Sequence, residues 1–270
     1  MEDTQFDIDS IATIANQTHS RRKFLSTAGI GALAVASLTL AGKSAEARGS
    51  SHDQAIVQAA ATAEALATVM YYNIVNSSIY TDGLSTNAND QAYLVAGYEQ
   101  ELDHYQLLNS VYPALATTFY FPTGMFGDAS TYATTVNTLV TLEDAFIAAY
   151  LIGIRDLSSA GLKVLAGQIM GVECEHRAFG RVIAADLNLH STTGLSGQAE
   201  GVDGVNNFAA NNLSYERKFN GPGGLNTIND VVNALMPFLG KPTAGFSTQP
   251  FKLSDSLGLN ERIVLSDTTP

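Results

Sequence analysis

The chain has 270 residues, with 26 acidic against 14 basic side chains and a formal net charge of −12 at pH 7. This charge argues against nucleic acid and anionic membrane surfaces as partners, since both attract basic proteins. Its one cysteine, Cys174, excludes an intramolecular disulfide, so packing, or packing together with bound metal, must hold the core.

The N-terminal segment has the order of an export signal. A basic stretch, "SRRKFL" at 20–25, precedes the apolar run at 26–42, and "AEA" follows as a cleavage motif. The paired Arg21 and Arg22 resemble a twin-arginine signal, which implies export of the folded chain to the periplasm or the exterior. We therefore expect residues 1–47 to be removed. No later apolar run is expected to span a bilayer, so the mature protein should not be a membrane protein.

Four segments with helical periodicity follow, and each has an acidic residue near its middle. Asn89 or Asp90 is expected to cap the second helix, which Pro113 ends, and Ser130 is expected to cap the third. The predicted helices cover residues 52–77, 90–112, 131–156 and 160–188.

The acidic residues are placed where a solvated charge is not expected. Glu64 is the one charged residue between Gln54 and Ser78, and its face is otherwise apolar. Glu143 has a similar setting, with Asp144 as its one charged neighbour. The other two helices carry Glu-x-x-His, which places both side chains on one helix face. Each acid lies near the middle of a helix about 37 Å long, so all of them meet at one level of a bundle.

Four carboxylates at one level of a core could not all stay ionised without compensation, because burial and mutual repulsion raise their pKa values. Two divalent cations would balance four Glu and two neutral His. Two single Glu and two Glu-x-x-His form the ligand set of ferritin-like di-iron and di-manganese proteins. We expect the Glu of each Glu-x-x-His to bridge the ions. The predicted ligands are Glu64, Glu101, His104, Glu143, Glu173 and His176.

The predicted fold is all-α, a four-helix bundle of the ferritin-like kind with one long crossover. The link between the second and third helices, residues 113–130, contains two Pro and two Gly and is expected to be irregular. Its 18 residues can extend about 60 Å, enough to return along the whole bundle.

Residues 52–188 resemble the ferritin-like domain of exported, desiccation-related bacterial and plant proteins. The resemblance rests on the helix pattern and on "GVECEHRA" with its Glu-x-x-His. It implies the six ligands named above and iron or manganese as the metal. The bundle is assigned to 48–190. The remaining 191–270 form a loop-rich extension with one short helix, which packs on the bundle or on a partner subunit of a homo-oligomer.

The function expected from this pattern is an oxidoreductase, ferroxidase-like or catalase-like, that reacts with dioxygen or peroxide in oxidative or desiccation stress. No catalytic residue beyond the ligands is predicted. One alternative is a metal-stabilised protective or binding module without turnover. Another is a metal-free bundle in which Glu64 and Glu143 are protonated and hydrogen-bonded.

Several polar residues are predicted to lie outside the ligand set. His52 and His190 lie at or beyond the ends of helices, and Cys174 is rotated away from its neighbour Glu173. Three tyrosines share the faces that carry the acids. Each is expected to be a core residue, although one could hydrogen-bond a ligand or relay an electron; they are Tyr71, Tyr98 and Tyr150.

Overall fold

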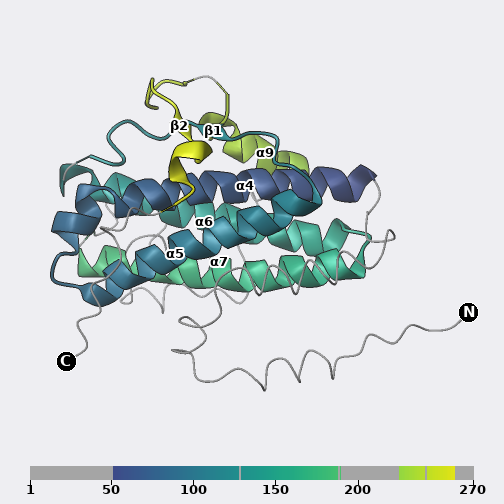
Figure 1. Ribbon diagram of the computed structural model, residues 1–270, viewed down its shortest axis with the longest axis horizontal. Coiled ribbons are helices and arrows are strands. Elements are labelled where there is room, and N and C mark those ends of the chain that lie inside the picture. The colour runs from purple at the N-terminus through teal and green to yellow at the C-terminus, as the bar shows by residue number, and fades with distance from the viewer. Residues whose placement is uncertain (1–50, 128, 188, 190–224, 241, 259–270) are drawn as a thin grey trace, which may run out of the picture. The chain divides into compact units, whose positions relative to one another are not determined.

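The computed structural model describes residues 51–127, 129–187, 189, 225–240 and 242–258. Within these ranges, four long helices lie side by side as a bundle (Figure 1). The predicted all-α, ferritin-like bundle is thus confirmed. The helices are α4 (Ser51–Val75), α5 (Ala88–Val111), α6 (Tyr132–Asp156) and α7 (Ala160–Asp186).

Two of the predicted helix caps were wrong by a few residues. Helix α5 is capped by Asn87, whose side-chain oxygen accepts a hydrogen bond from the backbone N–H of Asp90. Asn and Asp are both favourable N-cap residues, so the local sequence alone does not show which of Asn87, Asn89 and Asp90 caps the helix. Helix α6 has Thr131 as its N-cap instead of Ser130, because a 3₁₀ turn, η3 (Ala129–Thr131), leads directly into it.

The bundle consists of two helix pairs, α4 with α5 and α6 with α7. Buried Asp53, at the start of α4, links the pairs at one end of the bundle. Its carboxylate accepts hydrogen bonds from the N–H and hydroxyl of Ser158 and from the N–H of Ser159, which caps α7. These bonds hold the start of α4 against the short turn between α6 and α7.

Among the described residues, one helix, α6, is long and apolar enough to cross a membrane by length and composition. A segment that passes this test was not expected after the signal, but whether the mature protein spans a membrane stays a prediction. However, α6 carries Glu143 and Asp144 near its middle, and 61% of its most apolar window is buried inside the protein. Its apolarity is what a helix in the centre of a bundle requires.

The connection between α5 and α6 returns along the bundle on the side of α4, as expected for a long crossover (Figure 1). It is not wholly irregular. Its strand β1 (Thr118–Phe119) pairs antiparallel with β2 (Phe251–Lys252) of the C-terminal extension. Edge-to-face aromatic contacts join the same two segments; the rings are Phe121, Phe126, Phe238, Phe246 and Phe251.

The described part of the extension packs on the bundle. Its short helix α9 (Ile228–Leu235) contacts α6 and α4 and begins with a capping box between Thr227 and Asp230. Three further short elements lie in the described part of the chain, namely the π-helix η2 (Ile79–Gly83) and the 3₁₀ helices η6 (Met236–Phe238) and η7 (Leu253–Ser256).

Two earlier predictions, the export signal at 1–47 and the position of His190, lie outside the described residues. The predicted loop-rich extension, 191–270, lies outside them at 191–224, 241 and 259–270.

Candidate metal centre

The six acids and histidines singled out in the sequence come together in the middle of the bundle. Glu64 extends from α4, Glu101 and His104 from α5, Glu143 from α6, and Glu173 and His176 from α7. Five of the six residues are at most 1% exposed, and the sixth, His104, has 12% of its side chain exposed. Isolated acids on apolar faces therefore end as a polar cluster inside an apolar core.

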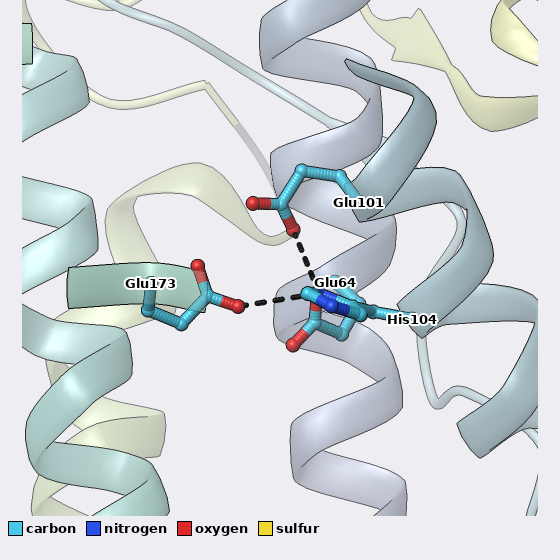
Figure 2. Close-up of side chains that lie close together, drawn as sticks. All are labelled: Glu64, Glu101, His104 and Glu173. Carbon is cyan, nitrogen blue, oxygen red and sulfur yellow. Dashed lines mark ion pairs between the residues drawn. The ribbon is translucent and has the colours of Figure 1, made fainter. Parts of the chain in front are cut away.

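The cluster divides into two halves. In the first half, the Nδ1 atom of His104 lies 3.3 Å from Glu64 Oε2, 3.4 Å from Glu173 Oε1 and 3.9 Å from Glu101 Oε2. Figure 2 shows these three carboxylates arranged around the imidazole. One ligand atom from each of the four residues can be chosen so that all lie within 4.8 Å of one another.

In the second half, the Nδ1 atom of His176 lies 2.7 Å from Glu101 Oε1, 3.3 Å from Glu173 Oε2 and 4.0 Å from Glu143 Oε1. Glu101 and Glu173 thus belong to both halves, and each turns one carboxylate oxygen toward each half. A carboxylate placed in this way can bridge two metal ions, while Glu64 and Glu143 each serve one half.

The residues fit a pair of metal ions because their hydrogen bonding is incomplete. A buried polar atom without a partner costs about 1–3 kcal/mol, so a cluster of such atoms in a folded core requires an explanation. Metal ligation would satisfy all of them at once. The buried cluster atoms without a hydrogen bond to any described residue are Glu64 Oε2, Glu101 Oε1 and Oε2, His104 Nδ1, Glu143 Oε2 and Glu173 Oε1.

The electrostatics of the metal-free cluster also reflect the crowding of four carboxylates. Burial, followed by the charge of Glu173, raises the pKa values of Glu101 and Glu143 well above their ordinary range. Burial acts in the same direction on Glu173, but the two neighbouring imidazoles outweigh it and lower its pKa. His104 shows the reverse balance: burial lowers its pKa, and Glu64 with Glu173 raises it to about 10.

Three polar side chains around the cluster orient its members. The Nε2 atom of His176 lies 2.8 Å from Gln100 Oε1, and this contact holds the ring so that Nδ1 faces the carboxylates. The hydroxyl of Tyr71 donates to Glu143 Oε1 at 2.8 Å, and that of Tyr150 donates to Glu64 Oε1. Burial and the adjacent carboxylates raise the pKa values of both tyrosines well above the ordinary value, so the hydroxyls keep their protons.

The sequence did not identify Gln100, which is polar and lies on an exposed part of α5. It did place the tyrosines on the acid-bearing faces. Two of the three, Tyr71 and Tyr150, contact the cluster, whereas the hydroxyl of Tyr98 donates to the backbone oxygen of Ser256, 2.7 Å away in the C-terminal extension.

Among the described residues, His52 and Cys174, which were predicted to lie outside the ligand set, belong to neither half of the cluster. His52 is exposed, Cys174 is half-buried, and Asp144 pairs with Arg177 at 2.9 Å.

Comparison with known families agrees with this geometry. The family described as "Ferritin-like domain" matches residues 52–185. This stretch of the chain is similar to that family, and its four long helices form a ferritin-like bundle. All six cluster residues lie within it, and α9 with the rest of the extension lies beyond it. No curated protein matches the sequence.

Proposed function

We propose that the ferritin-like domain binds two divalent ions, iron or manganese, and reacts with dioxygen or peroxide. The observation that carries the proposal is the pair of four-residue groups that share Glu101 and Glu173, in which six buried ligand atoms make no hydrogen bond to any described residue. Oxygen and imidazole ligands suit iron and manganese. His104 and His176 would serve one ion each.

Two bound divalent ions would supply one electron each, which with two protons reduces dioxygen to hydrogen peroxide. The chain's own residues contribute positioning and protection. Gln100 fixes the orientation of His176, and the apolar core around the cluster excludes bulk water. Escape of reactive species is thereby limited.

An apolar cavity next to the first half of the cluster favours dioxygen over peroxide. The cavity has a volume of about 30 Å³, and Ala60, Leu108 and Tyr150 line it, with Ile228 and Val231 of α9. Ala60 lies one helical turn before Glu64, and Leu108 lies one turn after His104. An apolar cavity of this kind stays dry and accepts small apolar molecules, whereas peroxide would lose its hydrogen bonds to water there.

Consumption of dioxygen tests this function. The purified chain is loaded with iron(II) or manganese(II) without air, separated from free metal, and mixed with oxygenated buffer in an oxygen electrode. We expect the loaded protein to take up about one dioxygen per chain in the first turnover. The rate of this uptake should be well above that of the same metal free in solution. Glu175→Gln, an exposed neighbour of the cluster, is the control and should behave as the wild type. Uptake no faster than that of free metal would refute the reaction.

A second candidate function is a metal-stabilised module without turnover, in which the ions only compensate the buried carboxylates. The same observation favours it, because unpartnered carboxylates call for cations whether or not chemistry follows. It predicts a large metal-dependent rise in melting temperature together with no uptake of dioxygen or loss of peroxide.

We also propose that the protein is exported already folded, through Arg21 and Arg22, and acts outside the cytoplasm in oxidative or desiccation stress. Folding before export would let the site close around iron or manganese in a compartment where free copper and zinc are scarce. Protein exported by its own signal should then hold iron or manganese, whereas the mature chain refolded in a metal mixture should take zinc or copper. The same metal in both samples would contradict this route.

A further inference from the structure

The two tyrosines at the cluster are arranged in a crossed pattern. Glu64 and Tyr71 are seven residues apart on α4, and Glu143 and Tyr150 are seven residues apart on α6. Each tyrosine contacts the glutamate of the other helix: Tyr71 donates to Glu143 and Tyr150 donates to Glu64. Both tyrosines are buried, so water does not compete for these hydrogen bonds.

In both pairs, the hydroxyl donates to one carboxylate oxygen, and the other oxygen makes no hydrogen bond to a described residue. The Oε1 atoms of Glu64 and Glu143 accept the tyrosine protons, while their Oε2 atoms make no hydrogen bond to any described residue. The two carboxylates that accept a tyrosine hydroxyl, Glu64 and Glu143, are also the two that each belong to only one half of the cluster. Glu101 and Glu173, which belong to both halves, accept no tyrosine hydroxyl in the described structure.

We propose that Tyr71 and Tyr150 are positioning residues that restrict Glu143 and Glu64 to one ligating oxygen each. The proposal rests on the two-metal function above. A carboxylate with one oxygen held by a hydroxyl binds a metal through the other, whereas a released carboxylate can chelate through both. Each tyrosine would thereby keep one coordination position open on the nearest ion, where an exogenous molecule can bind.

The backbone is shaped to admit one of these rings. Gly97 of α5 lies directly against Tyr71, and a Cβ atom at position 97 would be 2.8 Å from Cε1 and 3.1 Å from Cδ1 of the ring. Real side chains do not approach this closely, so any larger residue would displace Tyr71. A glycine in the interior of a helix costs about 0.5–1 kcal/mol relative to alanine, which is consistent with a packing role for Gly97 here.

The test compares Tyr71→Phe, Tyr150→Phe and the double variant with wild type, and Tyr98→Phe is the matched control. Tyr98 is also buried and also donates one hydrogen bond, but to Ser256 in the extension. Each protein, produced without residues 1–47, is loaded with iron and oxidised. It is then titrated with azide, a small anion that binds open coordination positions on iron(III). Metal content and carboxylate infrared bands are measured on the same samples.

We expect all variants to keep the wild-type metal content. At each iron of the double variant, azide should bind about fivefold to tenfold more weakly, the size of effect expected for one lost hydrogen bond per iron. Each single variant at Tyr71 or Tyr150 should weaken azide binding at one iron. These variants, but not Tyr98→Phe, should lose infrared bands of monodentate carboxylate. The proposal would be overturned if the double variant bound azide as tightly as wild type and had the same infrared spectrum as the Tyr98→Phe control. It would also be overturned if the Tyr71→Phe or Tyr150→Phe substitution caused loss of metal. Failure of the wild-type protein to hold metal would refute the two-metal function itself.

Discussion

Binding of metal to the cluster should release about three protons per chain at pH 7. In the metal-free chain, burial and neighbouring carboxylates raise the pKa values of Glu101 and Glu143 well above the ordinary value, and the pKa of His104 is raised to about 10. His104 therefore carries a proton at neutral pH, and we expect Glu101 and Glu143 to hold protons as well, because burial favours their neutral forms. Ligation needs carboxylates and a neutral imidazole, so all three protons must leave.

The size of the effect follows from linkage. If three protons leave, the overall binding constant rises about a thousandfold per pH unit, or about 4 kcal/mol at about 1.4 kcal/mol per proton. The metal-free fold has the opposite dependence. Glu101 and Glu143 bind protons more tightly in the folded chain, so their contribution to stability is present at low pH and is lost as the pH rises through their folded pKa values.

Calorimetry measures the proton count directly. Manganese(II) is titrated into metal-free protein in buffers with different ionisation enthalpies, and the slope of the observed enthalpy against ionisation enthalpy gives the number of protons released. The exposed control Glu175→Gln should release the wild-type number. A release of less than about one proton, with tight binding, would refute the reasoning about the buried charges.

Three further substitutions test the packing, each by urea denaturation. Gly180→Ala should destabilise the fold by about 1–3 kcal/mol, since its Cβ would lie 2.6 Å from Cδ2 of Leu139. Gly171 lies in the same helix, and a Cβ atom added there would have no atom within 4 Å, so Gly171→Ala should be neutral or stabilising by about 0.5–1 kcal/mol. Equal effects of the alanine substitutions at Gly171 and Gly180 would contradict this packing. Asp53→Ala should cost about 1–3 kcal/mol by removing the hydrogen bonds from Ser158. Burial raises the pKa of Asp53, but the hydrogen bonds from Ser158 and Ser159 outweigh it and lower the pKa, so its contribution to stability should be lost in acid, below about pH 4. A variant as stable as wild type at pH 7 would refute this role.

The sequence predicted the bundle because its strongest signals are local. Helical periodicity repeats within each segment, and a lone Glu64 on an apolar face indicates a buried partner without knowledge of the fold. Features that depend on tertiary contacts were harder to predict. The spacing of Tyr71 from Glu64 places both on one helix face, but does not reveal that Tyr71 bonds Glu143 instead.

The strand, the glutamine and the helix cap that the sequence did not predict correctly have similar explanations. Strand β1 spans two residues, too few for an alternating pattern, and its partner β2 is far away in the sequence. Gln100 resembles any solvated glutamine until α7 brings His176 within hydrogen-bonding distance. The cap of α5 was assigned to Asn89 or Asp90 because several good capping residues stand together there, and local composition does not distinguish Asn87 from them.

Elemental analysis of the purified protein tests the central claim most directly. Full-length protein, produced with its own N-terminal segment and purified without chelator, is assayed for iron, manganese, zinc and copper per chain. The account predicts about two ions in total, iron or manganese, and a clear loss in Glu101→Gln and Glu173→Gln, which remove the shared carboxylates. Fewer than about one and a half ions per chain, with none regained on reconstitution, would contradict it.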